Sequence, residues 1–461
     1  MQRDSIDFGK MNIPSLFVKM FIPTLMGFLF TAMFNLADGI FVGQGVGSDA
    51  LAAVNIAAPI FLLATATALM FGTGVSVVAA IHLARGSKKA ACINMTQAFG
   101  VSLLITTVLM LLSIFFPRQV CMLFGGSERL MPLVTDYLVW VSPCLVMVMI
   151  EIVGMFVIRL DGAPKFAMWA NIIGSVLNIF LDWLFVFPLN MGIKGAAIAS
   201  SISAAVGAAL VIIYLSRYSR NLHFYRLKTS HKSMRLTLRN VGYMSKLGLS
   251  TFIGEAAISC LMTTGNFMFM KYLHEDGVAA FSVACYLFPL VFMFGNAISQ
   301  TSLPIVSYNH GLGDRARILK TLRLSLVLAI ICGLLLTLGG IFLRSPIISL
   351  FLEPDSNAFT IADEGFPYLA ASFLFFTLNL VLIGFFQSIE HPKPAITFML
   401  LRGFVVLVPC FIVLPLLLGI PGLWLTITAA ELLTCITIAA FMLHNNIKIK
   451  QTSESNSQVI K

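Results

Sequence analysis

The sequence is poor in charge: only 11% of its 461 residues are Asp, Glu, Lys or Arg, where soluble domains carry about 25%. Hydrophobic residues make up 58%. This composition argues against a soluble globular protein and against a disordered chain, which would have low hydrophobicity. Strand-like alternation over about ten residues is also missing, which argues against a membrane β-barrel. We therefore expect an all-α polytopic membrane protein.

Motifs for metal binding, phosphate binding and catalysis are missing too. The eight cysteines are scattered without a C-x-x-C pair, and the seven histidines form no ligand spacing. The sequence contains no G-x-x-x-x-G-K-[ST] loop, no G-x-S-x-G and no H-E-x-x-H. These absences argue against an ATP-driven pump and against an enzyme. We expect no cofactor and no resident metal, apart from a transported ion.

Long apolar runs are abundant. Breaks of Gly, Pro and charge divide them into twelve segments, each near or above the roughly 20 residues that cross the hydrocarbon layer as a helix. The predicted transmembrane helices are 14–42, 51–83, 90–116, 131–158, 164–187, 195–216, 241–271, 278–307, 318–343, 361–388, 394–417 and 422–444.

Basic residues predict the orientation of these helices. The stretch 217–246, which contains the link between the sixth and seventh helices and the start of the seventh, carries eight Lys or Arg and no acid, which places the link in the cytoplasm by the positive-inside rule. Six crossings on either side place both termini there as well. The net charge of +10 then indicates loops against anionic lipid, and not a nucleic-acid surface. We expect a multi-pass protein of the plasma membrane.

The two halves of the chain repeat each other at a spacing of 227 residues. This shift aligns residues 50–53 (ALAA) with 277–280 (GVAA), and 192–195 (GIKG) with 419–422 (GIPG). Each half has six helices, so both copies cross the membrane in the same direction, as in transporters built from parallel repeats. We therefore predict two six-helix lobes, 1–216 and 241–446. A basic cytoplasmic linker, 217–240, joins the lobes, and a polar cytoplasmic tail, 447–461, follows.

Two carboxyl groups are predicted at matching depth in the first lobe. Asp38 lies six residues before Gln44, and Asp182 lies six residues before Pro188. Amides share their helix faces, because side chains three or four residues apart are neighbours on a helix. These amides are Asn35 beside Asp38, and Asn178 and Asn171 on the helix of Asp182.

Such a pair of carboxyl groups can bind either a proton or Na⁺. Adjacent carboxylates can capture a proton reversibly, and with amide oxygens they can instead ligate Na⁺; Asp38, Asp182 and Asn178 are its candidate ligands. The repeat places Gly265 and Pro409 at the equivalent positions, so a purely structural need shared by both halves is disfavoured. Solvation of both acids at the outer rim is the alternative.

Three further acids fall inside apolar runs. Glu255, in the middle of the seventh helix, is either a second ion site or cation contact, or a structural partner of Arg402. Glu431 is the other candidate partner of Arg402. Glu151 lies toward the cytoplasmic end of its helix, where we expect it to extend toward water.

The residues that carry the most specific resemblance are NLADGIFVGQGVGSDALAAVNIAAPI (35–60), LDGAPKFAMWANIIGSVLNIFLDWLFVF (160–187) and GIKGAAIAS (192–200). Together with the repeat, they resemble the multidrug and toxic compound extrusion (MATE) family over nearly the whole chain. The resemblance implies two lobes around a cleft that opens alternately to each side. It also implies export of organic cations in exchange for H⁺ or Na⁺.

The resemblance also implies roles for individual residues. Asp38, Asn178 and Asp182 match the family's acid and N-x-x-x-D pair, while Tyr137 and Ser200 match hydroxyl groups near those acids. Glu255 resembles the acid of a carboxy-lobe cation site, but Asn379 stands on the tenth helix without an Asp to complete that site.

We therefore expect a secondary antiporter for small organic cations, acting as a monomer. The alternatives are a lipid-linked precursor flippase of the same superfamily, and a scaffold or receptor that transports nothing.

Overall fold

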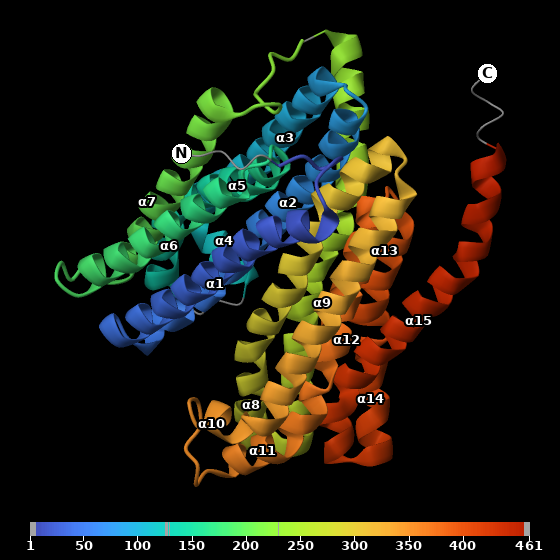
Figure 1. Ribbon diagram of the computed structural model, residues 1–461. Coiled ribbons are helices and arrows are strands. Elements are labelled where there is room, and N and C mark those ends of the chain that lie inside the picture. Colours follow the sequence, from blue (N-terminus) through green and yellow to red (C-terminus); the bar gives the residue numbers. More distant parts are fainter. Residues whose placement is uncertain (1–5, 125–127, 129, 229, 456–461) are drawn as a thin grey trace. The chain divides into compact units, whose positions relative to one another are not determined.

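A computed structural model describes residues 6–124, 128, 130–228 and 230–455, and the regular elements of this part are all helices (Figure 1). The first half contains α1 (Ile13–Gly45), α2 (Ser48–Ala84), α3 (Lys88–Phe115), α4 (Pro117–Leu123), α5 (Met131–Leu160), α6 (Pro164–Val186), α7 (Gly192–Ile213) and η1 (Tyr214–Tyr218). The second half contains α8 (His231–Leu312), α9 (Arg315–Phe342), α10 (Arg344–Ile348), α11 (Asn357–Ala370), α12 (Ser372–Ser388), α13 (Pro392–Leu400), η2 (Leu401–Val405), α14 (Leu407–Leu418) and α15 (Ile420–Ser455).

By length and composition, the helices of this described part are sufficient for twelve membrane crossings once α8 is divided at its break. Ten helices are long and apolar enough to cross, and α11 with α12, bent by 41°, makes an eleventh crossing. That count takes α8 as one helix of 82 residues, although His274 interrupts it with φ 56° and ψ −149°. A straight α8 would be about 120 Å long, four times the hydrocarbon thickness, so its two parts are separate crossings. The predicted all-α polytopic fold is confirmed.

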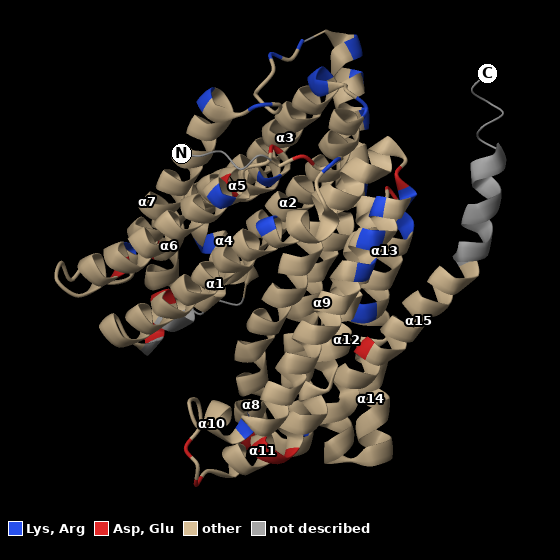
Figure 2. Ribbon diagram, viewed as in Figure 1, with Lys and Arg blue, Asp and Glu red and all other residues tan. Residues whose placement is uncertain are grey.

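The chain divides into two compact units. The first unit holds the residues up to Glu255 together with Gln300–Arg323 and Phe385–Pro392. The second unit holds Ala256–Ser299, Leu324–Gly384 and the residues from Lys393 onward. The lobe boundaries drawn from the sequence stay predictions, as does the cytoplasmic side. Lys and Arg are dense around the link between α7 and α8, as the orientation rule requires (Figure 2).

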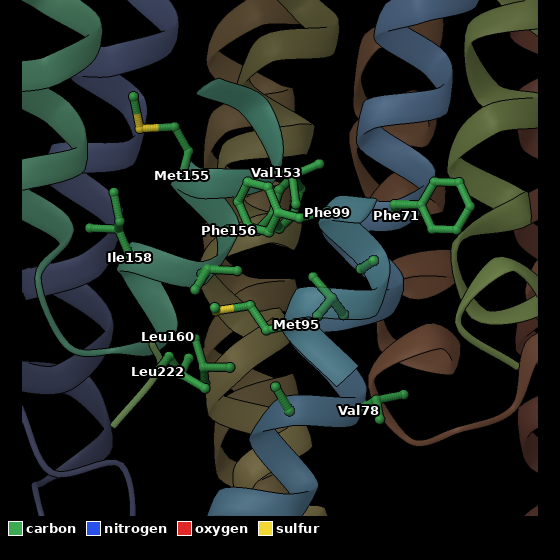
Figure 3. Close-up of a cluster of buried hydrophobic side chains, with 14 of the residues drawn as sticks. Phe71, Val78, Met95, Phe99, Val153, Met155, Phe156, Ile158, Leu160 and Leu222 are labelled. Carbon is green, nitrogen blue, oxygen red and sulfur yellow. The ribbon is translucent and has the colours of Figure 1, made fainter. Parts of the chain in front are cut away.

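The core of the first unit is a cluster of large apolar side chains from α2, α3 and α5 (Figure 3). Phe71, Met95 and Phe156 are almost completely buried there, and Met244 and Leu247 from the start of α8 join them. Because lipid is as apolar as these side chains, such helices associate mainly through close packing.

Glycine allows α8 to approach α2 at van der Waals distance in the first unit. A Cβ at Gly248 would lie 1.8 Å from the carbonyl oxygen of Met70, and one at Gly74 would lie 2.2 Å from that of Met244. Both obstacles are backbone atoms, which cannot move aside without shifting a helix. Small residues are therefore required at this crossing.

We predict that Gly248→Ala destabilises the protein by about 1–3 kcal/mol, because the added methyl group forces the two backbones apart. The measurement is the melting temperature of the detergent-solubilised protein. Gly242→Ala is the matched control, since a Cβ at Gly242, also on α8, has no atom within 4 Å. Equal melting temperatures for both variants would contradict the close crossing.

The loop between α12 and α13 is held in the first unit by Glu390. The hydroxyl group of Tyr243 donates to Oε1 of Glu390 at 2.7 Å, and Nε2 of His310 lies 3.7 Å from Oε2. Glu390 has φ 58°, a backbone conformation that L-residues rarely adopt. The interaction with His310 lowers the pKa of Glu390 against the opposing effect of burial, and Tyr243 lowers the pKa further.

A carboxyl group with a lowered pKa stabilises the folded state above its ordinary pKa, 4.5, and loses this contribution as pH falls through the folded-state pKa. We therefore predict that Glu390→Gln lowers the melting temperature at pH 7, and that the difference from the wild type shrinks on acidification below about pH 4.5. Glu353→Gln, at an exposed glutamate, should show no such difference at either pH.

Candidate functional site

The ends of α1 and α6 pack tightly against each other. A Cβ at Gly45 would lie 2.2 Å from Val186, and the rings of Phe41 and Phe187 meet edge to face with centroids 5.7 Å apart. This contact fixes the depth of α1 against α6. It brings the last two turns of both helices, and the acids they carry, to the same level.

Asp38 of α1 and Asp182 of α6 lie together, close enough for their carboxyl groups to interact directly. Asp182 is completely buried and Asp38 is half-buried. Within the described residues, the two side-chain oxygens of Asp182 and Oδ1 of Asn178 have no hydrogen-bond partner. Buried acceptors without partners are costly, so these oxygens favour an added proton or cation.

Two of the predicted amides belong to this cluster. Asn178 stands one turn before Asp182 on the same face of α6, and its Nδ2 lies 3.4 Å from Oγ of Ser200 on α7. Asn171, two turns before Asn178 on α6, accepts a hydrogen bond from the hydroxyl group of Thr31 at 3.1 Å. Polar side chains thus continue along the contact between α1 and α6.

The remaining predicted site residues differ in their surroundings relative to the Asp38–Asp182 pair. Tyr137 of α5 lies within electrostatic range of both Asp38 and Asp182. Asn35, in contrast, is exposed. Glu255 is half-buried and has no hydrogen bond or ion pair within the described part of the chain.

The sequence analysis missed one polar group of α5 and predicted the wrong surroundings for another. Cys144 donates its thiol to the carbonyl oxygen of Ser200 at 3.4 Å. The carboxyl group of Glu151 lies against Gly207 of α7 and near Gly174 of α6, inside the bundle. The expectation that Glu151 extends toward water is therefore wrong. The two facing glycines were the available signal, because they leave space for a side chain from the neighbouring helix.

Comparison with known proteins identifies the family. A family model described as MatE matches residues 23–184 and again 251–412. The two matches begin 228 residues apart, one residue from the repeat spacing found in the sequence. The chain belongs to the MATE family of membrane transporters. Its members are transporters and not enzymes.

Relatives of this MATE transporter include proteins with different names. A protein named FAD transporter from Shewanella oneidensis is 26% identical over 72% of this chain and 73% of its own length. Multidrug export protein MepA from Staphylococcus haemolyticus is 22% identical over 92% of both chains.

Solved MATE structures share the fold. An outward-facing multidrug resistance MATE transporter superposes with a TM-score of 0.87 at 20% identity, covering 96% of this chain and 98% of its own. The D35N mutant of VcmN from Vibrio cholerae has a TM-score of 0.87 at 18% identity, covering 94% of this chain and 97% of its own.

In the second unit of this MATE transporter, Arg402 neutralises the buried acid Glu431. Nε of Arg402 donates to both carboxylate oxygens of Glu431, at 2.7 and 2.9 Å, and Asn379 donates to Oε2 at 2.7 Å. The guanidinium also lies 4.0 Å from the ring centre of Phe376. Arg402 therefore pairs with Glu431, the second of the two partners that the sequence allowed, and its proposed pairing with Glu255 is wrong.

Breaking one side of a buried ion pair leaves an uncompensated charge, at a cost of about 3–5 kcal/mol. We predict that Glu431→Leu and Arg402→Met each lower the melting temperature strongly. We also predict that the double variant is more stable than either single variant, because no charge then remains buried. Simply additive losses in the double variant would show that the pair carries no coupling.

Proposed function

We propose that this chain is a secondary antiporter that exports cationic or amphiphilic organic compounds across the plasma membrane in exchange for H⁺ or Na⁺. The supporting observation is the contact between Asp38 and Asp182, with the unpartnered oxygens of Asp182 and Asn178 beside it. Two neighbouring carboxyl groups repel each other when both are charged. A proton or Na⁺ relieves this repulsion and links ion binding to the conformation of the first unit.

The charge inside the helices supports cationic substrates. Away from the helix ends, Arg402 is bound to Glu431, whereas Glu151 and Glu255 have no basic partner in the described residues. Unpaired acids favour organic cations over organic anions. The relatives named MepA, which match over 92% of this chain, are multidrug export proteins.

A second candidate is transport of an anionic dinucleotide. The relative from Shewanella oneidensis, whose name is FAD transporter, favours it at 26% identity. A lipid-linked precursor flippase is the third candidate; either anionic substrate would need free basic side chains where this chain has acids.

The test uses proteoliposomes loaded with an organic cation dye or with FAD, with pH and Na⁺ gradients imposed separately. We predict that the wild type exports the dye under one of the two gradients. Asp38→Asn with Asp182→Asn should reduce this gradient-driven export by roughly tenfold or more, because amides neither bind a proton nor carry charge for Na⁺.

Asp136→Asn is the matched control. It makes the same chemical change on α5, at an acid that forms a half-exposed ion pair with Lys194, and export should persist. Undiminished dye export by the double variant would refute the ion site. Gradient-driven export of FAD without the dye would instead favour the second candidate, and no export of either would favour the flippase.

A further inference from the structure

Glu151 lies against α6 and α7 in the first unit, between the Asp38–Asp182 pair and the turn that joins α5 to α6, which the positive-inside rule predicts to be cytoplasmic. It stands nine residues before the end of α5, which corresponds to about 14 Å of helix. A Cβ at Gly207 would lie 2.7 Å from Oε2 of Glu151, and one at Gly174 would lie 3.8 Å from Oε1. The carboxyl group therefore occupies the space between α6 and α7 that these two glycines leave open.

No basic group neutralises this carboxyl group within the described residues. Arg159, the nearest cation on α5, donates to Oε1 of Gln300 at 2.6 Å and lies over the ring of Phe28. Cys144 is the titratable group within electrostatic range of Glu151. The helices packed against α5 carry their other charged or titratable groups elsewhere along their lengths: Asp49 and His82 on α2, Lys88, Lys89 and Cys92 on α3, Arg118 and Cys121 on α4, Lys165 and Asp182 on α6, and Lys194 on α7.

A row of small and polar groups joins Glu151 to the acid pair. Asp182, Asn178 and Gly174 follow each other at steps of one turn on a single face of α6, about 12 Å from first to last. Asn178 contacts Ser200 of α7, and the thiol of Cys144 donates to the carbonyl oxygen of Ser200. The same thiol lies within electrostatic range of both Glu151 and Asp38.

We propose that Glu151 is a second proton-binding carboxyl group of the first unit, which receives the proton released by Asp38 and Asp182 and passes it to cytoplasmic water. The proton leaves one carboxyl group, which becomes a carboxylate, and the Glu151 carboxylate becomes the acid. Release to water restores Glu151, so charge and protons balance over a cycle. This proposal deepens the proposed antiport, on which it rests, by assigning H⁺ as the coupling ion.

The surroundings of Glu151 select a proton over Na⁺. A metal cation of this kind needs several oxygen ligands around it. Glu151 faces two glycines, and no amide, hydroxyl or second carboxyl group of the described residues hydrogen-bonds to it. A proton needs only the carboxylate itself, and it removes the cost of an intramembrane charge that has no counter-ion.

Glu151→Gln is the first test, because it keeps the size of the side chain and removes the proton site. In proteoliposomes, we predict that pH-driven dye export falls roughly tenfold or more, while dye–dye exchange without a gradient changes by less than about twofold. Glu151→Asp should retain part of the pH-driven export. If Glu151→Gln leaves pH-driven export intact, Glu151 only fills space and the proposal is wrong.

Two glycine variants test the position of the carboxyl group. Gly207→Ala should displace the carboxyl group and reduce pH-driven export, since its Cβ comes within 2.7 Å of a flexible side-chain oxygen. Gly100→Ala, on α3, places its Cβ where no atom lies within 4 Å and should leave export near the wild-type level. Equal effects of the two variants would contradict a role for the Glu151 carboxyl group.

Infrared difference spectroscopy tests proton binding without transport. Acidification should produce carboxylic acid C=O bands in the wild type. Glu151→Gln should remove one of these bands, and Asp38→Asn with Asp182→Asn should leave that same band in place. An identical band in the wild type and Glu151→Gln would overturn the assignment. If the wild type exports no dye under any gradient, the proposed antiport fails, whereas this spectrum still decides whether Glu151 binds a proton.

Discussion

An acid inside the hydrocarbon layer must be neutralised, and this requirement governs the polar interior of the molecule. A charge there costs roughly 2.5 to 3.5 kcal/mol on insertion scales, so it needs a partner or a mobile ion. Glu431 has a permanent partner in Arg402, with Asn379 completing the contact. Asp182 has only another acid, Asp38, beside it. A fixed cation thus neutralises Glu431 in the second unit, whereas in the first unit the proposed antiport assigns this role to a mobile ion.

Glycine determines where these acids meet. At Gly45, a Cβ would overlap Val186, and at Gly207 it would meet the Glu151 carboxyl group. Helices in lipid gain little from burying apolar side chains against each other, so close backbone contact through small residues supplies their association. The same contacts that hold α1, α5, α6 and α7 together therefore also set the distances between their carboxyl groups.

This arrangement gives the proposed antiport a physical basis in one unit. The acid pair is formed by Asp38 on α1 and Asp182 on α6. The polar row through Asn178 and Ser200 leads from this pair toward Glu151 on α5. Three acids on three neighbouring helices, none with a basic partner in the described part of the chain, can exchange protons without moving a metal ion. In the proposed antiport, cationic substrates and protons compete for the same negative charge, which is the requirement for exchange.

The sequence alone determined the membrane class, the twelve crossings, the repeat and the family, because each depends on hydropathy and residue order along the chain. It also singled out Asp38, Asp182 and Asn178, since acids and amides are rare in apolar runs. It failed for the surroundings of Glu151 and left the partner of Arg402 open between Glu255 and Glu431. A helix in lipid is apolar on every side, so its sequence carries no hydrophobic stripe to fix its rotation. Only the tertiary packing, through contacts such as Gly207 against Glu151, decided which side chains face one another.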